Sequence, residues 1–255
     1  MPELIVALDT PDLNSALHLV DRLRRHTRWF KVGLELFSAV GPRVVETLRS
    51  RDCDVFLDLK YLDIPNTVQA AARVAAGLGV NMLTIHLSGG QRMVQAALEG
   101  VRRGTPSSAS VPLVVGVTML TSLNQEDLSW MAKPGDKAAP DPGGLALVLA
   151  EHARRWGVDG VVCSAQEAAG IKSITDAACI CVTPGIRMPS DQQTKIAQDD
   201  QSRTLTPAEA VAAGSDYLVV GRPITRADDP ARAAESIMQS MAATIERRHP
   251  WPNLP

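Results

Sequence analysis

The chain has only four cysteines, no long apolar run and no block of one charge, and each scarcity excludes a class of protein. The cysteines (Cys53, Cys163, Cys179 and Cys181) are scattered in apolar context. No histidine or second cysteine pair lies near Cys179 and Cys181 to complete a metal site, so we expect reduced thiols in the core. No apolar run approaches the roughly 20 residues that a membrane span needs, so no transmembrane helix is expected.

Charge and composition narrow the choice further. The 255 residues carry 26 Lys and Arg against 28 Asp and Glu, a formal net charge of −2, and both signs are spread along the chain. This balance argues against nucleic acid or an anionic membrane surface as a general partner, so any anion must be bound locally. The first residues lead directly into an apolar run without a charged and apolar leader, and we expect a cytoplasmic protein.

Apolar strand-like runs alternate with helical patterns along the chain, an order typical of βα units around a parallel sheet. The runs that read as strands are 4–8, 29–32, 55–59, 82–86, 113–117, 160–163, 180–182 and 217–220. Apolar residues at helical spacing follow at 13–24, 39–49, 68–78, 92–101, 145–156, 165–171, 207–213 and 231–245. This order predicts a single-domain α/β protein over 1–255, a (β/α)₈ TIM barrel. A doubly wound open sheet is the alternative, but no GxGxxG motif follows the first strand.

Two connections are longer than the usual few residues. The segment 122–143 is predicted to contain a short helix at 126–131, and the polar segment 184–206 joins two predicted strands. Loops of that length in a compact domain are usually functional lids or disordered, and we favour a lid for 184–206.

The segment from Asp58 to Thr67, DLKYLDIPNT, places charged residues directly after an apolar strand. Side chains alternate along a strand, so Asp58 and Lys60 point to the same side. A lysine held between carboxylates keeps its proton at neutral pH and can act as a proton donor. The alternative is a solvent-exposed ion pair at the strand end. Pro65 starts a helix with Asn66 or Thr67 as the expected N-cap, so the charges lie in a βα loop.

Polar residues also follow the other predicted strands. In a barrel the carboxyl ends of the strands form one rim, which carries the active site. The rim residues are Asp9, Lys31, Asp58, Lys60, His86, Thr118, Thr121, Gly221 and Arg222. Each has an ordinary explanation when taken alone: Asp9 could cap the next helix, and His86 could be a hydrogen-bonded core histidine. Their shared placement favours an active site.

The seventh and eighth βα loops read TPGIR at 183–187 and VGRPI at 220–224. In a barrel this is the usual position of a phosphate, which backbone N–H groups and arginine side chains bind. Either pair could be only a turn glycine and a surface arginine. Two such pairs in adjacent loops favour a phosphorylated substrate.

Several motifs occur in order along nearly the whole chain. They are VALD at 6–9, FKVG at 30–33, DLKYLDIPNT at 58–67, VTMLTS at 117–122, TPGIR at 183–187, DQSR at 200–203 and VGRPIT at 220–225. Together they resemble orotidine 5′-phosphate decarboxylase. The resemblance implies conversion of orotidine 5′-monophosphate to uridine 5′-monophosphate and CO₂, the last step of de novo UMP synthesis, without metal or organic cofactor.

The resemblance also implies residue roles. Lys60 would protonate C6, Asp58 would lie beside the substrate carboxylate, and Lys31 and Asp63 would complete an alternating Lys-Asp-Lys-Asp network. Asp63 and Thr67 would act in the neighbouring subunit's site of a homodimer. The remaining substrate-binding residues would be Asp9 and Lys31 at the ribose, Thr121 at the pyrimidine, Arg187, Gln201, Gly221 and Arg222 at the phosphate, and also Ile64 and Pro184.

One position departs from the family pattern, and two other functions compete. Leu87 stands where the family more often has a small residue, which is expected to repack a loop beside the substrate. A related Mg²⁺-dependent sugar-phosphate decarboxylase or aldolase shares the DxKxxD core, but Ile64 to Thr67 and the long segment with Gln201 fit a nucleotide better. A catalytically silent phosphate-binding barrel would be expected to lack Lys60, which is present.

Overall fold

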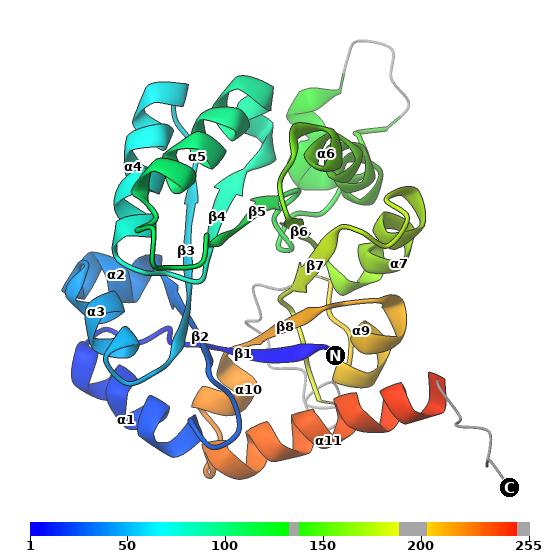
Figure 1. The fold of residues 1–255 in the computed structure, drawn as a ribbon. Helices are drawn as coiled ribbons and strands as arrows, with labels where there is room; N and C mark the ends of the chain where they lie inside the picture. Colours follow the sequence, from blue (N-terminus) through cyan, green and yellow to red (C-terminus); the bar gives the residue numbers. More distant parts are fainter. Residues whose placement is uncertain (133–137, 189–202, 249–255) are drawn as a thin grey trace, which may run out of the picture.

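The computed structural model describes residues 1–132, 138–188 and 203–248, and it confirms the predicted (β/α)₈ barrel. All neighbouring strands pair in parallel, and the first strand pairs with the eighth, which closes the barrel (Figure 1). The strands are β1 (Glu3–Ala7), β2 (Trp29–Gly33), β3 (Asp54–Tyr61), β4 (Met82–His86), β5 (Leu113–Val117), β6 (Gly160–Val162), β7 (Ile180–Thr183) and β8 (Tyr217–Val220).

Side-chain alternation along the strands produces two apolar layers. Phe56 and Met82 point into the barrel and pack with other inward residues below the carboxyl rim. Leu57 and Leu83 point outward and belong to the larger core between the strands and the surrounding helices. Asp58 follows Phe56 by two residues and therefore points inward as well, one level nearer the carboxyl rim. The barrel floor is thus apolar, whereas the rim is charged.

The helices surround the barrel (Figure 1). They are α1 (Leu13–Leu23), α2 (Leu34–Val40), α3 (Arg43–Arg49), α4 (Pro65–Gly77), α5 (Gly90–Gly104), α6 (Pro142–Trp156), α7 (Ala165–Ile174), α9 (Pro207–Ala213), α10 (Arg222–Thr225) and α11 (Pro230–Arg248), with 3₁₀ turns η1 (Leu87–Gly89) and η2 (Glu126–Met131). The prediction of one helix over 39–49 was wrong. Gly41 adopts a φ of 70° and Pro42 follows it, so the chain turns between α2 and α3.

The start of α4 also differs from the prediction. Asn66 and Thr67 were expected to cap this helix, but it begins at Pro65 and its N-cap is Ile64, which makes no side-chain capping bond. Proline suits the first helical position because its fixed φ is already helical and because an N–H at this position would have no partner within the helix. The carboxylate of Asp63 instead accepts a hydrogen bond from the N–H of Ile64 at 2.6 Å. The helix therefore begins two or three residues earlier than expected, and the loop between β3 and α4 is shorter by that amount.

The two described ends of the segment 184–206 lie against each other. Ile186 and Leu205 form an isolated parallel bridge, and the N–H of Arg187 donates to the carbonyl of Leu205 at 3.0 Å. Residues 189–202, on which the predicted lid depends, lie outside the described residues. All four cysteines are buried with free thiols, as predicted. Among the helices that the structure describes, none is long and apolar enough to cross a membrane.

Candidate active site

A pocket of about 270 Å³ opens at the carboxyl rim of the barrel. Most of the rim and loop residues selected from the sequence line it. They are Asp9, Lys31, Asp58, Lys60, Thr121, Pro184, Arg187, Gly221 and Arg222. They come from the ends of strands far apart in the chain, and they meet because all eight parallel strands end at the same rim.

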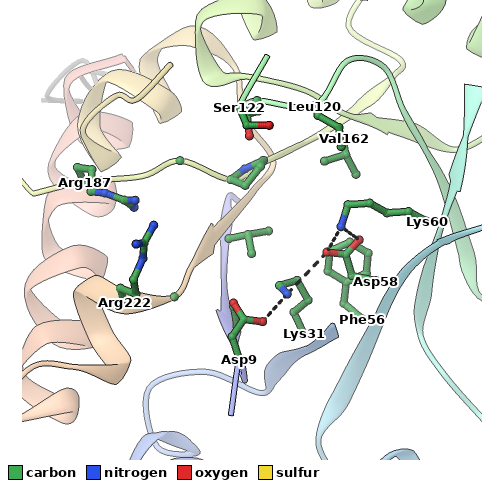
Figure 2. Close-up of a pocket in the computed structure, with 16 residues that line it drawn as sticks. Asp9, Lys31, Phe56, Asp58, Lys60, Leu120, Ser122, Val162, Arg187 and Arg222 are labelled. Carbon is green, nitrogen blue, oxygen red and sulfur yellow. Dashed lines mark hydrogen bonds and ion pairs between the residues drawn. The ribbon is translucent and has the colours of Figure 1, made fainter. Parts of the chain in front are cut away.

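Four charged side chains form one continuous network along a wall of the pocket (Figure 2). The Lys60 ammonium donates to both carboxylate oxygens of Asp58, at 2.9 Å each. Lys31 lies 3.7 Å from the other face of this carboxylate, measured from Nζ to Oδ2, and donates to Asp9 at 2.9 Å. Charges of alternating sign therefore run from Asp9 through Lys31 and Asp58 to Lys60.

The buried members of this network hold each other in their charged forms. Asp58 is only 8% exposed, and burial alone would raise the pKa of its carboxyl. The cations of Lys31 and Lys60 outweigh burial and lower the pKa of Asp58 below its ordinary value. Burial likewise tends to lower the pKa of Lys31, but the Asp58 and Asp9 carboxylates raise it above its ordinary value. Asp58 and Lys31 are thus ionised at neutral pH.

His86, at the end of β4, lies near this pair without lining the pocket. Burial, followed by the nearby Lys60 cation, lowers the pKa of its imidazole. At neutral pH His86 is therefore uncharged and adds no positive charge to the wall.

Lys60 has an unusual backbone conformation for a residue in a strand. Its φ is 52°, in the left-handed region that non-glycine residues rarely adopt. The pairing of β3 with β4 is irregular at the same place, because Leu57 pairs with Leu83 and the next pair is Tyr61 with Ile85. Strands close to functional sites often carry such irregularities, which redirect a side chain.

The opposite side of the pocket is built from the loops after β7 and β8. Gly185 has a φ of 78°, which favours glycine, and it precedes Arg187 by two residues. Arg222 begins the short helix α10, with Gly221 as its N-cap. The guanidinium groups of Arg187 and Arg222 point toward each other on the side of the pocket away from Lys60 (Figure 2). Two arginines and a helix start form an anion-binding arrangement of the kind found in phosphate-binding barrels.

Not every predicted site residue lies in this pocket. Asp63, Ile64 and Thr67 are exposed at the start of α4 and do not line it. Ile64 is 67% exposed and the nearby Leu62 is 55% exposed, so two large apolar side chains of the loop between β3 and α4 face solvent. Gln201 lies outside the described residues.

Some pocket residues were not selected from the sequence. Phe56, Val162 and Val219 supply apolar surface from inward positions of the strands, and Leu120 and Ser122 flank Thr121. Alternation along each strand could have identified the first three, since each is two residues from another inward position. Ser122 was within reach of the VTMLTS motif, but nothing in that motif distinguished it from its neighbours.

Leu87, the departure from the family pattern, is fully buried in the turn after β4. It packs over Gly116 of β5, where a Cβ atom would come within 2.4 Å of Leu87 Cδ2. The larger residue at 87 is therefore accommodated by the absence of a side chain on the neighbouring strand. This packing lies in the layer outside the strands and leaves the charged wall intact.

Comparisons with known proteins were consistent with one another. The model of the "Orotidine 5'-phosphate decarboxylase / HUMPS family" matches residues 2–237. A protein of Nitratidesulfovibrio vulgaris named orotidine 5′-phosphate decarboxylase is 50% identical over 243 residues, covering 95% of this chain and 99% of that protein. One from Laribacter hongkongensis is 49% identical, covering 94% and 93%. The crystal structure of orotidine 5′-phosphate decarboxylase from Lactobacillus acidophilus superposes with a TM-score of 0.80 at 35% identity, covering 94% and 99%.

Proposed function

The chain belongs to the orotidine 5′-phosphate decarboxylase / HUMPS family, and we propose that its charged wall and paired arginines carry out the reaction of the decarboxylases. The activity is the conversion of orotidine 5′-monophosphate to uridine 5′-monophosphate and CO₂, the last step of UMP biosynthesis. The single observation that carries the residue assignment is the Lys60 ammonium bonded to Asp58 in the pocket that also contains Arg187 and Arg222.

Lys60 is the proton donor in this proposal. When the bond between C6 and the carboxylate breaks, its electron pair stays on C6 and CO₂ leaves. The Lys60 ammonium faces this negative charge, stabilises it, and transfers a proton to C6. Preorganised charge in a site with little water is usually the largest contribution to catalysis, and a positioned proton donor adds to it.

Asp58 has two roles. It holds the Lys60 ammonium through two hydrogen bonds, and it lies beside the position proposed for the substrate carboxylate. At about 4 Å and an effective dielectric of about 20, repulsion between two carboxylates is worth on the order of 4 kcal/mol, and it disappears as CO₂ departs. Because such destabilisation of the ground state is small beside the whole barrier reduction, the main contribution is assigned to Lys60.

The remaining pocket residues position the nucleotide. Asp9 and Lys31, at the end of the network away from Lys60, suit the ribose hydroxyls as acceptor and donor. Arg187 and Arg222, with the backbone at Gly221, suit the phosphate, and Thr121 suits the pyrimidine ring. Binding energy from the phosphate is available to align C6 with Lys60. The contribution of Gln201 from a lid over 184–206 stays a prediction, because that residue lies outside the described chain.

We further propose a cytoplasmic homodimer in which Asp63 and Thr67 complete the partner's site, with Ile64 between them at the interface. The exposed position of these residues beside the pocket, together with the exposed Leu62, supports this assignment. A charged residue at Ile64, as in Ile64→Lys, should shift the protein toward monomers in sedimentation velocity and reduce activity. A fully active monomeric variant would refute shared sites.

The residue assignment is tested by the fall in ultraviolet absorbance as orotidine 5′-monophosphate becomes uridine 5′-monophosphate. Lys60→Met should lower kcat by on the order of 10⁴-fold or more, since it removes both the proton donor and the facing cation. Activity that survives EDTA supports the cofactor-independent reaction over a Mg²⁺-dependent relative. An active Lys60→Met variant would overturn the assignment.

A further inference from the structure

Thr84 lies in the middle of β4, fully buried, and points into the barrel beneath the charged wall. Its hydroxyl oxygen accepts a hydrogen bond from the backbone N–H of Lys60 at 2.8 Å. The same hydroxyl donates to Oδ1 of Asp58 at 3.1 Å. One side chain on β4 therefore contacts both members of the reactive pair on β3, although it does not line the pocket.

The first of these bonds replaces a missing contact between strands. Regular pairing of β3 with β4 stops after Leu57 and resumes only at Tyr61, so the N–H of Lys60 falls in the irregular stretch. A buried backbone N–H needs a partner, and the Thr84 hydroxyl supplies it. Because Lys60 has a φ of 52°, this bond also fixes the residue in a conformation that a lysine rarely adopts.

The second bond restricts the charge of Asp58. A hydroxyl has one proton, and Thr84 donates it to Asp58, so the arrangement matches an ionised carboxylate that accepts only. Asp58 then accepts from Thr84 on one oxygen and from Lys60 on both. The carboxylate is thus fixed in orientation as well as in charge.

We propose that Thr84 is a positioning residue for decarboxylation, which sets the Lys60 ammonium against C6 by holding the Lys60 backbone and the Asp58 carboxylate together. The inference rests on the proposed function of Lys60 as proton donor. In this proposal the hydroxyl of Thr84, and not its methyl group, aligns the Lys60 ammonium.

The test compares Thr84→Val, which keeps the shape and removes the hydroxyl, with Thr84→Ser, which keeps the hydroxyl. For Thr84→Val, kcat should fall about 10- to 100-fold with KM within about 3-fold, because a buried bond to a charged group is lost and the phosphate contacts remain. Thr84→Ser should stay within about 5-fold of the wild type. Thr175→Val removes another buried threonine hydroxyl, at the end of α7, and should lower stability without lowering kcat.

The pH profile of kcat/KM gives a second readout, which would not change if Thr84 had only a structural role. Asp58 faces Lys60 on its own strand and Lys31 from β2, with Asp9 beyond Lys31 and neutral His86 on β4. These charges are unchanged in Thr84→Val, so loss of the hydroxyl should shift the acid limb of kcat/KM to higher pH. Thr84→Ala carries the same expectations if Thr84→Val does not fold.

A wild-type kcat and pH profile in Thr84→Val, or equal losses in Thr84→Val and Thr84→Ser, would overturn the inference. A loss confined to KM would do the same, because it would place the effect on substrate binding. Wild-type protein that folds but does not consume orotidine 5′-monophosphate would instead overturn the proposed function. The two failures are therefore distinct.

Discussion

Removal of the Arg222 side chain should separate phosphate binding from the chemistry at C6. Arg222 begins α10 and points toward Arg187 on the side of the pocket away from Lys60. A guanidinium makes up to two charge-assisted hydrogen bonds to a phosphate, and each is worth about 1.5 to 3 kcal/mol. With partial compensation by Arg187, the loss is about 3 to 4 kcal/mol, which corresponds to a fall in kcat/KM of on the order of 10² to 10³.

The assay compares two substrates with each enzyme. For Arg222→Ala, kcat/KM should fall by this factor with orotidine 5′-monophosphate but change less than about 3-fold with orotidine, which lacks the phosphate. The matched control is Arg226→Ala, which removes an exposed arginine just after α10 and should leave both values unchanged. Urea unfolding should show a change within about 1 kcal/mol for both variants. Equal losses with the two substrates would show that Arg222 does not act through the phosphate.

Three further predictions concern stability, each measured as the free energy of unfolding in urea. Gly116→Ala should destabilise the protein by about 1 to 3 kcal/mol, because the new Cβ would come within 2.4 Å of Leu87. The cost should be smaller when Leu87→Ala is also present. Additive effects of the two substitutions would refute this packing. Arg203→Met should lower the free energy of unfolding by about 2 to 4 kcal/mol, because it leaves the buried Glu167 carboxylate without its ion pair. Adding Glu167→Gln to this variant should recover part of the lost stability. No recovery would contradict the pairing. The pKa of Asp58 is lower in the folded chain than in the unfolded chain, so its ionised carboxylate stabilises the fold above the pKa of the unfolded state. This stabilisation is lost as the pH falls through the pKa of the folded state. Asp58→Asn should therefore lose less stability below about pH 4 than the wild type does.

The fold could be predicted because its signals are local and repeated. Each strand is a short apolar run, and each following helix has apolar residues at helical spacing, so β4, β5 and β8 were located to the residue. The break between α2 and α3 was missed because the apolar spacing continues through it. The turn depends on the backbone conformation of Gly41 and on Pro42, whose effects were outweighed by that spacing.

The site could be predicted to the extent that it follows from the barrel itself. Parallel strands bring their carboxyl ends to one rim, so the positions of Asp9, Lys31 and Asp58 at the ends of predicted strands were enough to group them. Residues that serve another subunit cannot be located in this way, because the strands of their own chain do not bring them into the pocket. Asp63 and Thr67 are exposed in the single chain, and their assignment depends on the family resemblance together with that exposure.

Lys60 shows where the sequence rule reaches its limit. Alternation correctly placed Lys60 on the same wall as Asp58, but regular alternation assumes an extended strand, and Lys60 has a positive φ within an irregular pairing. The irregularity depends on how β3 aligns with β4, which no pattern within β3 reveals. A strained conformation persists only where its surroundings hold it, and here Thr84 and Asp58 do so through the backbone and the ammonium. The residue at which the local rule fails is therefore the one to which the chemistry is assigned, as expected where function rather than stability determines the geometry.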